Sequence, residues 1–497
     1  MKKTQMLPLA AIISGLLVGC GGGGGGGGGG APAEPTYTWQ FVHLHSESRT
    51  SIAANCVIFT DDSSIDGNAI TASIADEGFK ILFHNSDGSV VSSETISDIP
   101  DTGKVEIRSG AIPDDGYVSL EEVVGGLGNR NDVYMFTLQK DLMTDLVLNV
   151  RQQSNRSNQC YQGEQYSLTV SDDAAVAVAQ SSVDTSYYQS SYINSTSSGS
   201  QLSANIPVKA PLNGTKRALV TAFDTVTDNG AGDEFTDLMY FAVIPSESIY
   251  DKNNPPSTLP SVSMLDSDNS GVIINANRFS IDNTSRVDVA IDNELYQWQP
   301  IYSDSTTISY SSNGAFSDGW NVKANGTSDA GNWNVNTLTA FEGNDISISV
   351  PAVNDFSTTT IDSSCTADYC LNTTGFTPSD FNIQRTHVRG STTLTYDFYQ
   401  SIYAVPSTNQ ALMESSVVDY QVQPSDRIEV SLGTVDLDNA DSKAWFMERN
   451  MNLQSIVDID LANFTDVNGS ITQPSAVKTR NVSMLGNSVS AVENGVN

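Results

Sequence analysis

The chain has 497 residues, of which 58 are Asp or Glu and 24 are Lys or Arg, and its formal net charge at pH 7 is −34. This charge excludes nucleic acid and anionic lipid headgroups as electrostatic partners. The acids are 42 Asp and 16 Glu, which favours turns and loops over helices because Asp bonds its own backbone whereas Glu is a helix former.

The N-terminus carries the features of an export signal. Lys2-Lys3 precedes an apolar stretch, residues 6–18, that is too short to span a bilayer and ends in Leu17-Val18-Gly19-Cys20. This ending resembles the lipobox of bacterial lipoproteins. The resemblance implies that residues 1–19 are removed as a signal peptide and that the Cys20 sulfur carries lipid, which anchors the protein without a membrane span. The alternative is a plain secretory signal with an unmodified cysteine.

Residues 20–35 form a predicted flexible tether behind this anchor. Ten consecutive glycines, Gly21–Gly30, have no side chains to bury and reach roughly 20 Å in root-mean-square terms. In lipoprotein families an Asp after the lipidated cysteine commonly retains the protein at the inner membrane. Gly21 stands there, so the resemblance implies the outer membrane, with the surface and periplasmic faces both open.

Four further cysteines fit an oxidising compartment. Cys56, Cys160, Cys365 and Cys370 allow three pairings, of which we favour Cys56 with Cys160 and Cys365 with Cys370. The first would join the two ends of one domain and the second would close a short loop. Thiolate ligation of a metal is disfavoured because no histidines lie nearby.

The secondary structure is predicted to be almost entirely β. Apolar residues alternate with polar ones, as at Phe79, Ile81 and Phe83, and Asp-Gly and Asn-Gly turns such as Asp87-Gly88 punctuate these runs. The pattern predicts several antiparallel β-sandwich domains in tandem behind the tether. Residues 172–180 are either a short helix or an edge strand. The predicted domains are 36–171, 172–255, 261–355 and 356–497.

Two local features refine this division. Residues 67–107 give strand, turn, strand, turn, strand, and they weakly resemble transthyretin-like sandwich modules. Residues 251–260 contain Pro255-Pro256 and Pro260 among polar residues, which indicates a linker or a long loop.

Calcium is the cofactor that the acid-rich turns suggest. Two segments place oxygen-bearing side chains at first, third and fifth positions before a glycine, as in Asp-x-Asp-x-Asp-Gly calcium loops. These predicted ligands are Asp62, Ser64 and Asp66 in one segment and Asp266, Asp268 and Ser270 in the other. Both segments lack the glutamate six residues after the glycine, and solvated hairpin turns are the alternative interpretation.

A window rich in aromatic residues suggests a carbohydrate-binding face. Tyr296, Trp298, Trp320 and Trp333 stand among Ser, Asn, Asp and Gly. Exposed rings beside amides and hydroxyls stack on sugars and bond their hydroxyl groups. The alternative is that these rings form a sandwich core.

Catalytic signatures of the common hydrolases and nucleotide enzymes are absent from the sequence. The histidines are His43, His45, His84 and His387. His43 and His45 alternate on a predicted strand that also carries Trp39 and Phe41, so a packed position or one at the sheet margin is favoured over metal binding.

The sequence therefore predicts a non-catalytic, lipid-anchored envelope or cell-surface protein with a structural, adhesive or assembly role, as in surface coats or flagellar sheaths. A glycan-binding surface lipoprotein, with or without calcium, is the first alternative. A polysaccharide hydrolase that uses a carboxylate pair is the second. The expected partners are the membrane, through the anchor, and glycans or other envelope proteins.

Overall fold

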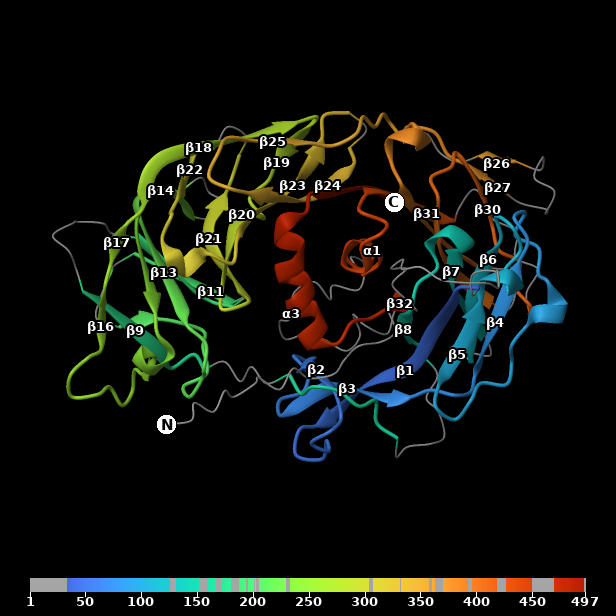
Figure 1. Cartoon of the computed structure of the whole chain (residues 1–497), viewed down its shortest axis with the longest axis horizontal. Helices are drawn as coiled ribbons and strands as arrows, with labels where there is room; N and C mark the ends of the chain where they lie inside the picture. The colour runs from blue at the N-terminus through green and yellow to red at the C-terminus, as the bar shows by residue number, and fades with distance from the viewer. Residues whose placement is uncertain are drawn as a thin grey trace, which may run out of the picture. The chain divides into compact units, whose positions relative to one another are not determined.

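The computed structural model describes residues 34–125, 131–151, 159–166, 171–179, 187–193, 195–200, 202, 205–228, 233–303, 307–330, 332–356, 360–362, 370–391, 396–417, 426–448 and 469–495. In these ranges strands predominate, and two α-helices occur, α1 (Ala440–Met447) and α3 (Pro474–Ser483) (Figure 1). The predicted all-β, mostly antiparallel architecture is confirmed. Residues Thr36–Asn497 form one compact unit.

The largest sheet of this unit has twelve strands, and its neighbours are antiparallel except for the parallel pair β29 and β7. In spatial order the strands are β21 (Glu294–Ile301), β20 (Ser285–Ile291), β23 (Trp320–Ser328), β24 (Asn334–Phe341), β33 (Val489–Gly495), β31 (Arg427–Thr434), β28 (Ile383–Ser391), β29 (Tyr396–Ala404), β7 (Asn131–Gln139), β6 (Tyr117–Gly125) and β4 (Phe79–His84), with β19 (Phe279–Ile281) beside β23.

This sheet corrects the predicted domain boundaries. It joins strands from three of the four predicted domains, because β7 from 36–171 pairs with β29 from 356–497, and β24 from 261–355 pairs with β33. The predicted segments after residue 35 are therefore parts of one compact unit. Alternating hydrophobicity marks a strand and its dry face but does not specify which strand lies beside it, so long-range pairing could not be predicted from the pattern.

A six-stranded sheet packs against one end of the large sheet. Its strands are β2 (Ile58–Asp61), β3 (Asn68–Ile74), β1 (Thr36–Ser48), β8 (Leu146–Asn149) and β32 (Gly469–Ser470), with β5 (Lys104–Arg108) beside β1. Trp39 and Phe41 of β1 share a buried core with Ile81 of β4 and Phe136 of β7. This pairing of two sheets over one dry core is a β-sandwich. Strands β3 and β4, neighbours in sequence, lie in different sheets.

Four smaller sheets complete the described part of this unit. They comprise β11 (Ser195–Gly199), β10 (Tyr187–Tyr192), β13 (Ala218–Asp228), β14 (Asp233–Ile244) and β17 (Leu265–Asp266); β12 (Ile206–Pro207), β9 (Ala174–Ala179), β15 (Tyr250–Asp251) and β16 (Ser261–Ser263); β22 (Thr307–Tyr310), β18 (Asp268–Asn277) and β25 (Ile346–Ser349); and β26 (Thr360–Asp362), β27 (Cys370–Asn372) and β30 (Asn409–Ala411). Phe241 of β14 and Trp298 of β21 belong to the same core cluster.

Two open interpretations are settled by these strands. Residues 174–179 form strand β9 rather than a helix. Strands β15 and β16 both pair with β9, so residues 252–260 between them are a surface loop that begins and ends on one strand. They are not a linker between domains.

Local sequence explains how several elements begin and turn. The side chain of Asn439 accepts hydrogen bonds from the backbone N–H groups of Asp441 and Ser442 and so caps α1, while Pro474 opens α3. The predicted Asp87-Gly88 turn requires glycine. Gly88 has φ +88°, and a Cβ there would lie 2.0 Å from the carbonyl oxygen of Leu412.

Candidate functional site

A cleft of about 780 Å³ opens beside β1 and β3 and contains the disulfide that joins Cys56 to Cys160. The Cα atoms of these cysteines are 5.5 Å apart and the bridge closes a sequence separation of 104 residues, as predicted. Residues after Cys160 extend the sheet, because the N–H of Tyr161 donates to the carbonyl of Ala72 and the N–H of Val57 donates to the carbonyl of Tyr161. The disulfide thereby fixes one wall of the cleft.

Polar side chains dominate the lining of the cleft. Carboxamides come from Gln40, Asn55, Gln159 and Gln162, and hydroxyls come from Ser51 and Ser73. Asn55, Gln159 and Gln162 are exposed, whereas Gln40 is buried and donates to the carbonyls of Thr102 and Gly103. Such a surface suits a ligand with many hydroxyl or amide groups. These residues match no sequence motif, and the paired cysteines were the one signal that could have brought 55–56 and 159–162 together.

A short row of ionisable side chains borders the cleft along β1. The ring of His45 stacks on His43 with centroids 6.0 Å apart, and its Nε2 lies 3.6 Å from Oε2 of Glu47. Burial lowers the pKa of His43, a hydrogen bond to the carbonyl of Val150 partly opposes this, and the neighbouring His45 lowers it further. The lowered pKa favours the neutral form of His43. Both imidazoles are partly buried on β1, which is an interior strand of the six-stranded sheet.

The other two histidines are packed inside the large sheet. His84 accepts a hydrogen bond at Nε2 from the Ser119 hydroxyl at 2.8 Å, and His387 contacts the Ser401 hydroxyl at 2.8 Å. These contacts have the residue types of a nucleophile and its base, but His84 and Ser119 are 0% exposed. Burial lowers the pKa of His84 to about 4. Burial also lowers the pKa of His387, as do the nearby arginines. Both imidazoles are therefore buried groups whose neutral form is favoured.

The buried carboxylates of the described residues are likewise engaged by the protein. Three of them accept hydrogen bonds: Asp62 from Ser64, Glu121 from Ser415 and Ser416, and Glu122 from the N–H of Arg151. The other three form ion pairs: Asp288 with Arg286, Glu294 with Lys216 and Lys478, and Glu448 with Arg480. Burial raises the pKa of Glu448, opposed by Arg480 and Thr472. These buried carboxylates therefore bind protein groups.

The aromatic window is a core, which corrects the predicted sugar-binding face. Tyr296, Trp298, Trp320 and Trp333 are between 0% and 4% exposed. The rings of Trp298 and Trp320 meet edge to face at 4.9 Å, and Phe316 packs against both. Rings buried in this way cannot stack on a polysaccharide.

The polar atoms of three of these residues are satisfied internally. Trp298 Nε1 donates to the carbonyl of Ser309 at 2.9 Å, Trp333 Nε1 donates to the carbonyl of Asn354 at 2.9 Å, and the Tyr296 hydroxyl donates to the carbonyl of Arg217 at 2.8 Å. This explains how residues with polar tips can enter a dry core.

The two predicted calcium segments differ from each other in the structure. Asp62 and Gly67 bound a turn between β2 and β3, where the Asp62 carboxylate accepts from the backbone and hydroxyl of Ser64. Burial would raise the pKa of Asp62, but hydrogen bonds from Ser46 and Ser64 outweigh it and lower the pKa. Ser64 and Asp66 are exposed at this turn. Among the described residues, no group of three or more His, Cys, Asp or Glu is placed to hold a metal ion.

The second segment is extended, which corrects the predicted calcium loop. Asp266 lies in β17 opposite Tyr240, whereas Asp268 lies in β18 opposite Tyr310 and Ser270 lies in β18 as well. A calcium loop needs a tight turn that gathers these positions. The strands place them on different partners instead.

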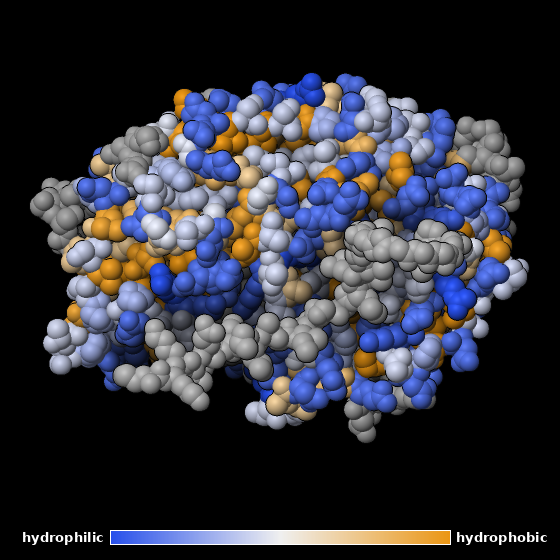
Figure 2. Space-filling view, in the orientation of Figure 1, coloured by the Kyte–Doolittle hydropathy of each residue, from blue (hydrophilic) through white to orange (hydrophobic). Residues whose placement is uncertain are grey.

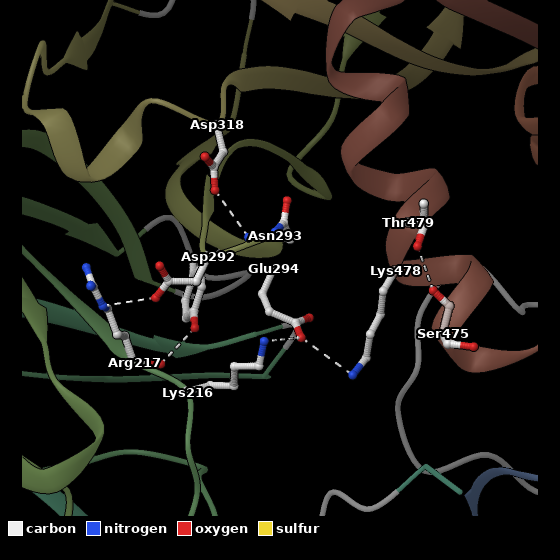
Figure 3. Close-up of polar contacts among 10 residues, drawn as sticks. Lys216, Arg217, Asp292, Asn293, Glu294, Asp318, Ser475, Lys478 and Thr479 are labelled. Carbon is white, nitrogen blue, oxygen red and sulfur yellow. Dashed lines mark hydrogen bonds and ion pairs between the residues drawn. The ribbon is translucent and has the colours of Figure 1, made fainter. Parts of the chain in front are cut away.

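A cluster of charged side chains, drawn in Figure 3, joins α3 to the β20–β21 hairpin. Lys216 and Lys478 approach Glu294, with Nζ atoms 3.1 and 3.5 Å from the same carboxylate oxygen. Asp292 and Asn293 at the tip of the hairpin have positive φ, as a type I′ turn requires. The Glu294 side chain is 4% exposed, so this cluster fixes the helix and offers no open site.

Cys370 is disulfide-bonded, while Cys365, Cys20 and the predicted tether up to residue 33 lie outside the described residues. The described helices include none that is long and apolar enough to cross a bilayer. Comparison of the chain with family models, curated proteins and solved structures gave no match.

Proposed function

We propose that this chain is a non-catalytic lipoprotein of a bacterial cell envelope, lipidated at Cys20, held at the outer membrane and serving a structural, adhesive or assembly role. The observation that carries the proposal is Leu17-Val18-Gly19-Cys20 followed directly by Gly21–Gly30. A lipid-bearing cysteine beside a glycine tether suits a folded unit held near a membrane.

Several features of the chain support this proposal. The Cys56–Cys160 disulfide suits an exported compartment. His84, His387 and the buried carboxylates serve packing and hydrogen bonding. Figure 2 shows hydrophilic residues spread across the face drawn, with hydrophobic residues between them, and the net charge of −34 keeps such a protein soluble and away from anionic headgroups.

The test of the anchor is metabolic labelling with a palmitate analogue in cells that express the protein or its Cys20→Ser variant. The native protein should carry label and sediment with outer membranes, and Cys20→Ser should lose both. A Gly25→Ser variant changes the tether but not the motif, so it should behave as the native protein does. Unlabelled native protein, or membrane sedimentation unaffected by Cys20→Ser, would refute the proposal. Protease treatment of intact cells then assigns the face.

A second candidate function is favoured by the cleft beside the disulfide. We infer that this cleft binds a neutral glycan chain, because its exposed carboxamides Asn55, Gln159 and Gln162 match the hydroxyl groups of a sugar. Affinity electrophoresis through a panel of neutral polysaccharides tests it. The double variant Asn55→Ala, Gln162→Ala should abolish any retardation, and Asn283→Ala, an exposed Asn outside the cleft, should not. Equal retardation of the native protein, the double variant and Asn283→Ala would contradict this function. A native protein that no polysaccharide retards would contradict it as well.

A further inference from the structure

A small cavity, partly open to solvent, lies where the C-terminal helix α3 meets the large sheet. Its volume is about 40 Å³, and its polar lining comes from Arg286, Asp288, Asn321 and Lys323 of β20 and β23 together with Arg480 and Asn481 of α3. Arg286 and Lys323 are cross-strand partners, as are Asp288 and Asn321. These pairs lie two residues apart along the strands, so they place four polar residues on one face of the sheet.

Two polar atoms of this lining are buried without a hydrogen-bond partner in the protein. They are Nη2 of Arg480, a donor, and Oδ1 of Asn321, an acceptor. Both residues are 2% exposed. A buried polar atom is costly unless it is hydrogen-bonded, so whatever fills the cavity must serve a donor and an acceptor together.

The charges around the cavity are already paired. Nη1 of Arg480 lies 2.7 Å from Oε2 of Glu448, and Nε of Arg286 lies 2.8 Å from Oδ1 of Asp288. An added halide ion would accept from Arg480 but leave the Asn321 oxygen unpaired. A water molecule accepts from the guanidinium and donates to the carboxamide, and about 40 Å³ holds roughly three water molecules at most.

We propose that this cavity is a structural water site that bridges Asn321 of the sheet to Arg480 of α3. The site ties α3 to β23 through solvent, beside the direct ion pair that Arg480 forms with Glu448. The proposal is independent of the lipid anchor and of the cleft.

A crystal structure of the protein at high resolution tests the site directly. We expect a water peak at about 2.7–3.2 Å from both Arg480 Nη2 and Asn321 Oδ1. A direct Asn321–Arg480 hydrogen bond, a cavity without density, or a halide recognised by its anomalous signal would each overturn the proposal.

Thermal unfolding of Asn321→Leu gives a second test, in which the melting temperature either falls or does not. If Asn321 Oδ1 has no partner, its removal is neutral or stabilising; if it binds water, the variant loses a hydrogen bond and leaves Arg480 unpaired. We expect the melting temperature to fall by about 1–2 °C or more. Ser431→Ala is the matched control, because its buried hydroxyl also lacks a partner but does not line this cavity. Its melting temperature should be unchanged or higher, and equal behaviour of the two variants would refute the bridge.

Discussion

The cleft beside the Cys56–Cys160 disulfide and the cluster around Trp298 use polar and aromatic side chains in opposite ways. In the cleft, carboxamides such as Asn55 and Gln162 are exposed on a wall that the disulfide fixes. Around Trp298, polar tips are bonded to backbone carbonyls and the rings are dry. The comparison teaches that composition marks neither region as a binding surface. A region can serve as a binding surface only where its polar atoms are exposed and not already bonded within the protein.

Breaking the covalent link should have the largest effect on the cleft side of this comparison. The double variant Cys56→Ala, Cys160→Ala frees a loop with a sequence separation of 104 and should lower the free energy of unfolding by about 4–5 kcal/mol, because the unfolded chain regains its entropy. Denaturant titration measures this loss. Reductant should destabilise the native protein more than the variant, and equal stability of the two proteins without reductant would contradict the role of the bridge.

The packed side of the comparison is tested by Trp298→Ala. Removing a side chain that is 0% exposed should cost about 3–5 kcal/mol, since it leaves a large cavity and an unpaired Ser309 carbonyl. Denaturant titration measures the cost, and Val405→Ala, at 43% exposure, should change little. The folded fraction of Trp298→Ala should retain any retardation by polysaccharide. Loss of retardation with full stability would restore the aromatic residues as a binding face.

Much of the local structure follows from the sequence, whereas its assembly does not. The alternating residues of β4 and the turn at Gly88 are where hydrophobic period and turn chemistry place them. The parallel pairing of β7 with β29 joins residues more than 250 positions apart, and no local pattern encodes such a partner. Helices α1 and α3 are short, and packing of Trp445 and Phe446 into the core holds α1 in place.

The candidate site likewise has one part that the sequence predicts and one part that depends on the fold. The disulfide of the cleft could be predicted because exported chains pair their cysteines. The carboxamides that line the cleft could not, since Asn and Gln are common on any surface and only the fold brings Asn55 to Gln162. The sequence left Trp320 open between an exposed sugar-binding ring and a core residue, because polar neighbours in sequence do not show whether a side chain is buried in the fold.

Acid should weaken the fold through His84, which is buried in β4 at the opposite end of the large sheet from Trp298. This imidazole is 0% exposed and its pKa is about 4 against an ordinary value of 6.5, so between these pH values the unfolded chain binds a proton that the folded chain does not. The contribution of His84 to the free energy of unfolding is therefore fully present above about pH 6.5. It falls by about 3 kcal/mol as the pH drops to about 4. Denaturant titrations from pH 7 to 4 measure the slope.

The contribution of His84 is isolated by comparison of variants. His84→Gln keeps a donor and an acceptor but does not titrate, so the difference in unfolding free energy between it and the native protein should narrow as pH falls. His45→Gln changes a histidine at the rim of the cleft and should leave the slope as it is. A slope that persists unchanged in His84→Gln would assign the acid sensitivity to other groups.

The smallest effect is expected where charges meet at the surface of α3. Lys478→Met removes one of two lysines that contact Glu294, and its side chain is 30% exposed, so the cost should be at most about 1 kcal/mol. Lys216→Met should cost a similar amount. The double variant should cost more than the sum of the two, because it leaves the nearly buried Glu294 carboxylate without a cation. Denaturant titration of the four proteins measures this coupling. Strict additivity would mean that each lysine acts alone and that Glu294 is not the shared acceptor holding α3 to the hairpin.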